Sequence, residues 1–351
     1  MNASELLSAN ELLVRHSKGE RDFQGANLIA VNLGEANLNR SNLSNASFKD
    51  SYLAKTKLIG ANLNGADFSD ANLSEAKLIE ANLSGASFTK TILIAADLSG
   101  VILSGAIFSE ADLTRATLIG TSMVGTCVLN GSKLNKANLT GATMSRAILS
   151  GADLTGATLN RVIMSQVDLS GTVLNQTSLI RAYLQGGNLS GAKLKEADLT
   201  EATLVDANLC AADLTGADLQ GANLRNANLS GANLSRVNLQ GANLSNTNLN
   251  GVILQNADLQ ATDLSKANLR GANLKAANLS GANLLEADLR GANLQQANLY
   301  GAGLLLVSLK GANLKEACLC HANLIGSSLN LSSLQDVCLK EAIMPNGSTY
   351  E

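Results

Sequence analysis

The sequence predicts an all-β fold in which the chain winds as a closed coil of short strands. A large apolar residue, which we call the centre of the repeat, recurs at every fifth position from Phe23 to Met344 with a single slip. A small residue, most often Ala, stands two positions before each centre. Because a period of five fits no helix, the chain has to turn after each short strand. Four centres are phenylalanines spaced twenty residues apart: Phe48, Phe68, Phe88 and Phe108.

The position of a residue in the repeat predicts the direction in which it points. Residues two apart on a strand lie on the same side, so the small residue and the centre face one interior. The Asn or Asp between them then faces outward. Gly often stands two positions after the centre, where a turn with positive φ favours it. The spacing of the phenylalanines equals four repeats, which predicts four repeats per coil and one stacked ladder of rings.

Runs such as ADLTGADLQGANLRNANLSGANL (residues 212–234) resemble the pentapeptide repeat family, in particular its long, cyanobacterial-type members. The resemblance covers about residues 21–344. It implies a right-handed, quadrilateral parallel β-helix, a single continuous solenoid of about 16 coils. The resemblance is specific for the fold and almost silent on function.

Residues 1–20 are expected to form a short N-terminal capping helix on the first coil. The stretch ASELLSANELLVRHSK (residues 3–18) has helical periodicity, and Gly19 is suited to end the helix. The opening ELL…GERDF is similar to the segment before the first coil in many cyanobacterial members. Five aliphatic side chains are expected to be buried there: Leu6, Leu7, Leu12, Leu13 and Val14.

The C-terminal tail, residues 345–351, starts with Pro345 and is too short for a helix. We therefore expect no helical cap on the last coil, and whether the tail or another chain covers this end stays open. An uncovered coil end is an open strand edge, where another chain can pair. A homodimer through the C-terminal end follows as an expectation.

The five-residue rhythm slips once, between Met123 and Leu129. If the count continues with one extra residue, Met123, Met144 and Met164 stack in one ladder. We therefore expect a one-residue bulge within residues 124–128 of a continuous β-helix, with Cys127 still in an interior position.

Composition excludes several classes of protein. Trp is absent, aromatic residues make up 3% and the net charge is −3, so neither a polybasic nor a strongly acidic chain is present. No apolar run is long enough for a membrane span, and the first twenty residues carry charges unlike a signal peptide. Five cysteines in so long a chain do not suggest a secreted disulfide scaffold. The expected location is cytoplasmic, without membrane contact.

Catalysis finds little support in the residues. The only histidines are His16 and His321, and no nucleophile elbow, phosphate loop or HExxH pattern occurs. Asp alternates with Asn at one position of the repeat. This exchange indicates that the position is selected for side-chain shape and hydrogen bonding and not for acid–base catalysis. We expect a protein that is not an enzyme and that binds no cofactor.

A cysteine cluster is the sharpest chemical feature. Cys318 and Cys320 flank the centre Leu319, and Cys338 occupies the position of Cys318 one coil later. Together with His321 they form a weak candidate for a metal set or a redox pair near residues 318–338. The alternative is structural, because small outward positions accept Cys as readily as Ser or Asn.

Outward aliphatic residues predict an interface. Leu285, Leu305 and Ile325 follow the centre in three successive coils and share one face, and Leu306 adds to them. Val205 lies on the same face, farther towards the N-terminus. Such a stripe is typical of a protein-binding surface. A second, broken stripe lies on another face of the N-terminal half: Ile59, Ile79 and Ile119.

Direct nucleic-acid binding is not expected, since Lys133 and Lys136 are the closest approach to a basic stripe. The resemblance raises an alternative, because some family members protect DNA gyrase from quinolones by mimicking DNA. Six carboxylates supply an acidic stretch for this idea: Glu196, Asp198, Glu201, Asp206, Asp213 and Asp218. Because the chain winds round four sides, these six carboxylates would be distributed over different faces of the coil. The favoured function is a non-enzymatic protein–protein interaction scaffold or regulatory binding protein with an unidentified protein partner.

Overall fold

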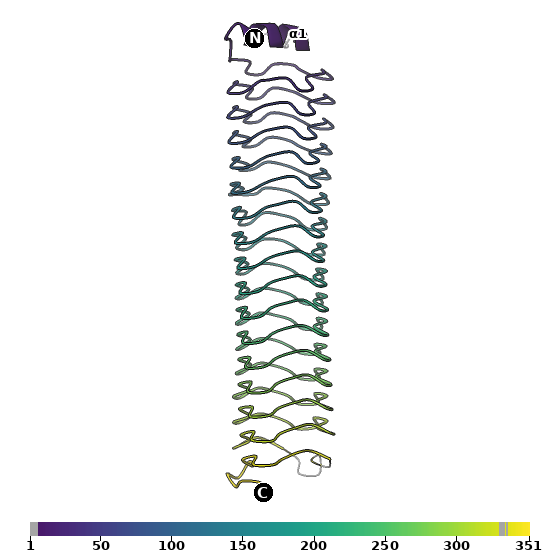
Figure 1. Ribbon diagram of the computed structural model, residues 1–351, viewed down its shortest axis with the longest axis vertical. Coiled ribbons are helices and arrows are strands. Elements are labelled where there is room, and N and C mark those ends of the chain that lie inside the picture. The colour runs from purple at the N-terminus through teal and green to yellow at the C-terminus, as the bar shows by residue number, and fades with distance from the viewer. Residues whose placement is uncertain (1–5, 330–333, 335) are drawn as a thin grey trace. The chain divides into compact units, whose positions relative to one another are not determined.

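The computed structural model describes residues 6–329, 334 and 336–351. The chain divides into two compact units, Met1–Ser178 and Leu179–Glu351. In both units the backbone winds in successive coils (Figure 1). One α-helix, α1 (Ala9–Ser17), is present among the described residues, and strand pairing there consists of single-residue bridges. That residues 21–344 form one continuous β-helix stays a prediction.

Parallel bridges fix the register of the coils. In the first unit Asn42 bridges Asp22 and Asn62, and in the second unit Asn228 bridges Asn208 and Asn248. Each of these pairs is twenty residues apart, so one coil comprises four repeats of five. The phenylalanine ladder follows from this register. The rings of Phe48, Phe68, Phe88 and Phe108 stack with centroids 4.8, 5.1 and 4.6 Å apart.

The interior of each unit is built from the centres and the small residues. Nearly all of these side chains are fully buried, from Leu28 and Ala61 in the first unit to Leu324 and Ala322 in the second. Phe68 fills a centre in the same way. Burial of the large centres supplies most of the hydrophobic stabilisation, since each contributes about 1.5–3 kcal/mol relative to an exposed side chain.

Hydrogen bonding explains why Asn or Asp precedes the centre. Of the five N–H groups of a repeat, three bond to carbonyls of neighbouring coils, and the next small residue bonds back to the centre. The fifth N–H, directly after the centre, bonds to the side chain of the Asn or Asp. Ser74 N–H, for example, donates to Asn72 Oδ1 at 2.9 Å. The Asx turn thus completes the backbone hydrogen bonding of the repeat.

The residue two positions after the centre has a left-handed backbone. Gly60 has a φ of +62° and Arg40, in the same position of an earlier repeat, has a φ of +56°. Glycine adopts this conformation without strain, which explains its enrichment there. The corner nevertheless accepts charged residues, because their side chains extend into solvent.

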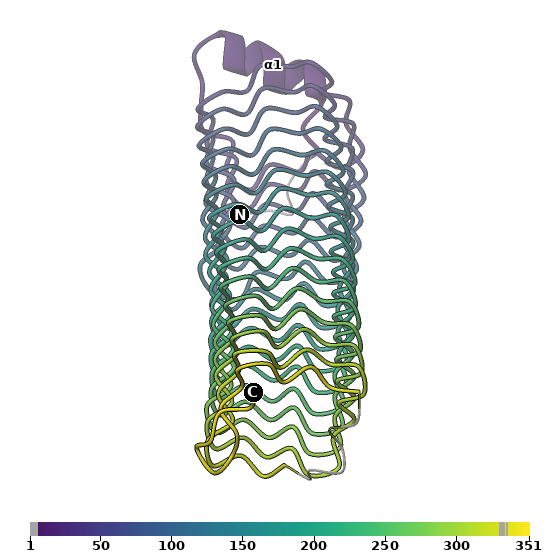
Figure 2. The ribbon, with the colours of Figure 1, turned by 60° about the horizontal axis from the view of Figure 1, so that its bottom comes forward.

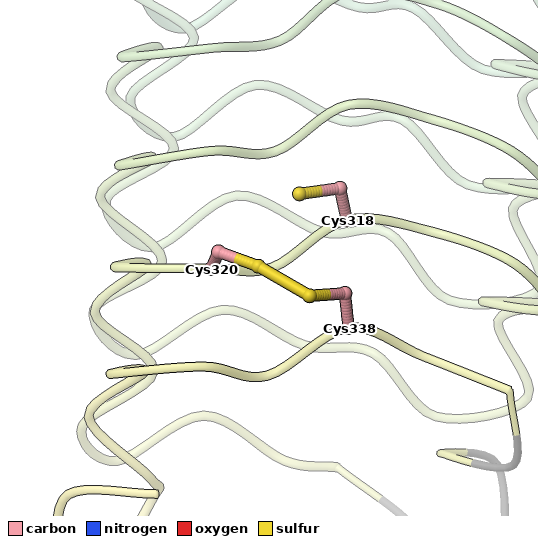
Figure 3. Close-up of side chains that lie close together, drawn as sticks. All are labelled: Cys318, Cys320 and Cys338. Atoms are coloured by element: carbon pink, nitrogen blue, oxygen red, sulfur yellow. A yellow bond between two sulfur atoms is a disulfide. The ribbon is translucent and has the colours of Figure 1, made fainter. Parts of the chain in front are cut away.

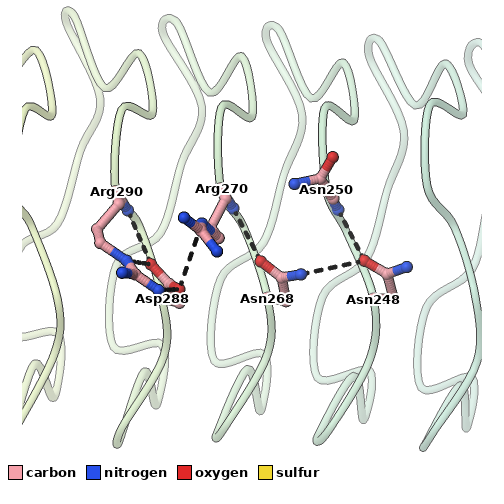
Figure 4. Close-up of polar contacts among 6 residues, drawn as sticks. All are labelled: Asn248, Asn250, Asn268, Arg270, Asp288 and Arg290. Carbon is pink, nitrogen blue, oxygen red and sulfur yellow. Dashed lines mark hydrogen bonds and ion pairs between the residues drawn. The ribbon is translucent and has the colours of Figure 1, made fainter.

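Outward asparagines form ladders from coil to coil. Asn268 Nδ2 donates to Asn248 Oδ1 at 3.3 Å, and Asn248 Nδ2 donates to Asn228 Oδ1 at 3.1 Å. Figure 4 shows the first of these steps together with the Asx turn from Asn250 N–H to Asn248 Oδ1 at 3.2 Å. Each amide donates towards the preceding coil, so the ladder needs an Asn at every step.

Asp288 ends this ladder, because a carboxylate has no N–H to donate to Asn268. Two arginines contact the Asp288 carboxylate instead (Figure 4). Arg290 Nε donates to Asp288 Oδ1 at 2.8 Å, and Arg270 Nε lies 3.7 Å from Asp288 Oδ2. The hydrogen bond from Arg290 lowers the pKa of the Asp288 carboxyl below its usual value. The charge at this step is therefore balanced locally.

The helix α1 begins later than the sequence predicts. Ser8 has an extended backbone and its side chain accepts a hydrogen bond from Glu11 N–H at 3.2 Å, which starts the helix at Ala9. Leu6 forms a parallel bridge to Asn27 instead of a helical turn. The expected helical residues 3–5 lie outside the described part of the chain.

Burial at α1 is also more selective than predicted. Leu12 is fully buried, whereas Leu6 is 62% exposed and Val14 42% exposed. Leu7 and Leu13 are half-buried. The Arg15 guanidinium lies 5.4 Å from the ring centre of Phe23, so α1 packs on the first centre at the N-terminal end of the first unit (Figure 2).

The extra residue at the slip lies between Ser122 and Val128. The bridge from Ile107 to Val128 spans twenty-one residues, and the register returns to twenty in the next coil. Gly125 has a φ of +95°, and Cys127 N–H bonds to Gly125 O at 2.9 Å, which makes a tighter turn than elsewhere. Cys127 is fully buried in the position of a small residue, and burial raises the pKa of its thiol to about 12.

The C-terminal tail folds back on the last described coil. Ile343 and Thr349 form an antiparallel bridge, and Tyr350 N–H donates to Ala342 O at 2.8 Å. Gly347, with a φ of +85°, supplies the turn. The tail therefore pairs with residues 341–344, which is one of the two outcomes that the sequence left open.

Candidate functional site

The predicted aliphatic stripe lies in successive coils of the second unit. Glu286 N–H donates to Leu305 O and Leu306 N–H donates to Ile325 O, each at 3.0 Å, which places the coils side by side. Leu305 is 36% exposed, Leu306 53% and Ile325 39%. Leu285 is half-buried. We use "the stripe" for Leu285, Leu305, Leu306 and Ile325.

The stripe continues to the C-terminal edge. Gly326 N–H donates to Pro345 O at 3.0 Å. Pro345 therefore occupies, in the next coil, the position that Ile325 has in its own coil. A hollow beside it is lined by Leu329, Met344, Pro345, Asn346 and Ser348. Leu329 and Met344 are centres, yet both are half-exposed, unlike the centres farther inside.

Glycines neighbour the leucines of the stripe. The Leu306 side chain covers Gly326, with Cδ2 2.7 Å from the point that a Cβ at Gly326 would occupy. Gly303 stands where Asn is usual and adds no side chain before the centre Leu304. Residues 302–308 and 322–328 contain no charged side chain. These two coils of the stripe are therefore free of charge, whereas Glu286 stands directly after Leu285.

Two other parts of the aliphatic prediction differ from the structure. Val205 is only 8% exposed, so it does not extend the stripe. In the second predicted stripe Ile119 is 43% exposed, whereas Ile59 and Ile79 are half-buried. The N-terminal stripe thus presents one well-exposed side chain.

Sequence reasoning missed an aliphatic group around the extra residue in the first unit. Ile102 is 46% exposed, Ile107 41%, Val124 55% and Ile163 45%. Three of these side chains stand directly before a centre, where Asn or Asp is usual. Counting large apolar residues in that position would have found them.

The cysteine cluster is assembled as the register predicts. Cys318 and Cys338 form a parallel bridge between neighbouring coils. Cys320 and Cys338 form a disulfide with a Cα–Cα distance of 5.9 Å, and the three sulfur atoms lie within 4.8 Å of one another. Figure 3 shows Cys318 beside this disulfide.

His321 lies apart from the sulfur atoms. Its Nδ1 is 3.2 Å from Glu341 Oε2, and its ring meets the ring of Tyr300 edge-on at 5.0 Å. Its backbone φ is +58°, so it occupies a left-handed corner. The structure brings together the three cysteines of the predicted set and not the histidine.

The acidic stretch of the second unit is partly neutralised. Arg181 Nε lies 2.6 Å from Glu201 Oε2, and the hydrogen bond from Arg181 lowers the pKa of Glu201. Lys195 Nζ lies 3.3 Å from Asp213 Oδ2. Pairing with cations reduces the negative field that DNA mimicry requires. The gyrase-binding alternative stays a prediction.

No helix in the described part of the chain is long and apolar enough to cross a membrane. No curated protein matches the chain at a significant level of similarity.

Several solved structures are similar to this chain. HetL, a pentapeptide repeat protein involved in heterocyst differentiation regulation from the cyanobacterium Nostoc sp. strain PCC 7120, is 28% identical over 98% of this chain and 99% of its own, with a TM-score of 0.16. Rfr23 from the cyanobacterium Cyanothece 51142 is 36% identical over 33% of this chain and 63% of its own, with a TM-score of 0.16.

Full-length QnrB1, a plasmid-mediated fluoroquinolone resistance protein, is 19% identical over 58% of this chain and 94% of its own, with a TM-score of 0.27. With TM-scores this low, the three similarities carry no argument about structure or function.

The profile of the family described as Pentapeptide repeats (8 copies) matches most of the chain. The matched residues are 22–58, 51–89, 66–105, 91–127, 126–161, 163–200, 192–231, 232–271, 267–304 and 308–344. The chain therefore belongs to the pentapeptide repeat family, and its coils form a right-handed β-helix solenoid.

Proposed function

We propose that the protein is a non-enzymatic interaction scaffold and that its first partner is a second copy of the same chain, bound through the stripe at the C-terminal end. The observation that carries this proposal is the exposed, charge-free aliphatic surface of Leu305, Leu306 and Ile325 in neighbouring coils. Interface cores are depleted of charged residues in the same way.

The surroundings of the stripe support an interface. The corner residue of a repeat is often charged, and Lys266 and Glu286 occupy this corner in the two coils before Leu306. Leu306 and Gly326 occupy this corner within the stripe. Grouped apolar side chains on a largely polar surface are typical of interaction sites.

A second copy fits this surface better than a charged partner. A two-fold interface places the same patch of each protomer against the other, so a charge close to the two-fold axis would meet its like. The neutral stripe avoids this repulsion. Its continuation through Pro345 to the half-exposed Leu329 and Met344 gives a two-fold contact further apolar surface at the C-terminal end.

Static light scattering over a range of protein concentrations tests the proposal. The wild-type protein is expected to have twice the chain mass of 36.2 kDa. The triple variant Leu305→Ser, Leu306→Ser and Ile325→Ser is expected to have the mass of a single chain. Circular dichroism verifies that the variant keeps its fold.

A matched control changes three aliphatic residues of similar exposure in the first unit: Ile102→Ser, Ile107→Ser and Ile163→Ser. This variant is expected to remain dimeric. A wild-type protein that stays monomeric at all concentrations, or a mass that the stripe variant leaves unchanged, would overturn the proposal.

A further inference from the structure

The cysteine cluster combines ligands from two neighbouring coils. Cys318 and Cys320 are two residues apart, so both project from the same side of one strand. Cys338 joins them from the next coil through its bridge to Cys318. All three sulfur atoms lie within 4.8 Å of one another, and Figure 3 shows them on one surface.

The donor set is sulfur alone. Among the described residues this is the one group of His, Cys, Asp or Glu side chains close enough to hold a metal ion. His321 is directed to Glu341 and Tyr300. Soft thiolate ligands select soft cations such as Cu(I), whereas Zn²⁺ in structural sites takes four ligands. Three sulfur atoms without a fourth protein ligand favour a three-coordinate cation.

We propose that Cys318, Cys320 and Cys338 form a three-thiolate binding site for one Cu(I) ion, and that the site exists only when the Cys320–Cys338 disulfide is reduced. The proposal is independent of self-association through the stripe.

A dithiol reductant gives two electrons and two protons to the disulfide, which becomes two thiols, while the dithiol becomes its own disulfide. Cu(I) then forms three Cu–S bonds and displaces three thiol protons, without any change in the oxidation state of copper. In the disulfide form only Cys318 retains a thiol, and one ligand does not make a site.

The position of the cluster makes binding feasible. Cys318 and Cys320 are half-buried and Cys338 is exposed. A small ion therefore reaches the sulfur atoms without unfolding of the coil. The other two cysteines lie outside the cluster. Cys127 is buried in the first unit, and Cys210, more than 100 residues before Cys318, accepts a hydrogen bond from Ser230 Oγ at 3.4 Å.

The test is a Cu(I) titration of the full-length protein in the presence of the competing chelator bicinchoninate, without oxygen. After reduction with a dithiol and removal of the reductant, the wild-type chain is expected to take one Cu(I) ion from the chelator. Thiolate-to-copper absorption in the ultraviolet and Cu(I)–thiolate luminescence are expected to saturate at the same ratio. Protein kept in the disulfide form is expected to take none.

Two cysteine variants provide the comparison. Cys318→Ser is expected to lose Cu(I) under the same competition and to keep its fold, because Ser occupies the same position of the repeat at Ser308 and Ser328. Cys210→Ser is expected to bind as the wild type does. Equal binding by wild type and Cys318→Ser, loss of binding in Cys210→Ser, or retention of Zn²⁺ in preference to Cu(I) would each overturn the proposal.

Discussion

The substitution Asn248→Ala is expected to speed hydrogen exchange at the Asn250 amide and to weaken the second unit locally. Asn248 Oδ1 accepts hydrogen bonds from Asn250 N–H at 3.2 Å and from Asn268 Nδ2 at 3.3 Å, and Asn248 Nδ2 donates to Asn228 at 3.1 Å. Each neutral hydrogen bond contributes about 0.5–1.5 kcal/mol. Because Asn248 is half-buried, the loss of all three is expected to cost about 2 kcal/mol, towards the low end of that sum.

Asn248→Asp separates the two roles of this side chain. The carboxylate keeps both acceptor contacts and loses only the donation to Asn228. Asp already occupies this position of the repeat at Asp288. The expected cost is therefore that of one hydrogen bond, about 0.5–1.5 kcal/mol.

Amide exchange measured by NMR distinguishes the variants. In Asn248→Ala the Asn250 amide loses its own acceptor, a single hydrogen bond of about 0.5–1.5 kcal/mol. At the upper end of that range the amide is expected to exchange about tenfold faster than in the wild type, since about 1.4 kcal/mol corresponds to a factor of ten. In Asn248→Asp that amide is expected to stay protected. If the alanine variant exchanges as slowly as the wild type, or if aspartate protects Asn250 no better than alanine, the Asx-turn explanation of the repeat is wrong.

Three further outcomes are expected from the first unit and from the charged ladder step. Phe68→Ala should lower the free energy of unfolding by about 3–5 kcal/mol, and Phe68→Leu by much less because Leu is the usual centre; equal shifts of the urea midpoint would contradict this. The buried Cys127 thiol, with a pKa of about 12, should resist an aromatic disulfide reagent at pH 8 until the chain unfolds, and rapid labelling of Cys127 itself in the native protein, located by mass spectrometry of peptides, would refute its burial. Arg290 lowers the pKa of Asp288 in the folded protein, so this pair stabilises the fold above the unfolded pKa of about 3.9 and the contribution is lost as the pH falls through the lower, folded pKa. A carboxyl NMR titration should find Asp288 titrating below its usual range and returning towards it in Arg290→Gln; the opposite shift would contradict the assignment.

The coil was predictable because each position of the repeat has one physical task. Leu and Ala fill the interior, Asn closes the Asx turn, and the corner adopts positive φ. The ends follow other rules. Leu6 pairs with Asn27 although its spacing also fits a helix, and hydrophobic periodicity does not separate these outcomes over one turn. The fold-back of the tail had a signal in Asn346-Gly347, a pair that favours tight turns between antiparallel strands.

The candidate sites were predictable as far as register decides them. Cys318 and Cys338 are twenty residues apart, so their proximity follows from the repeat. The pairing of His321 follows in the same way, because Glu341 stands twenty residues later at the same left-handed corner of the next coil. The exposure of Val205 was beyond the pattern, since burial at that position depends on the side chains of the neighbouring coils.

Both the stripe and the cysteine cluster depend on the twenty-residue register, and scalar couplings across hydrogen bonds measure this register directly. In a deuterated, isotope-labelled sample, the Leu249 amide nitrogen is expected to couple to the carbonyl carbon of Asn268, whose oxygen lies 2.8 Å away. Across the extra residue, the Phe108 amide is expected to couple to the carbonyl of Val128, one position later than the pattern elsewhere. Couplings from Leu249 to a carbonyl at any other spacing would contradict four repeats per coil, and with them the placement of both surfaces.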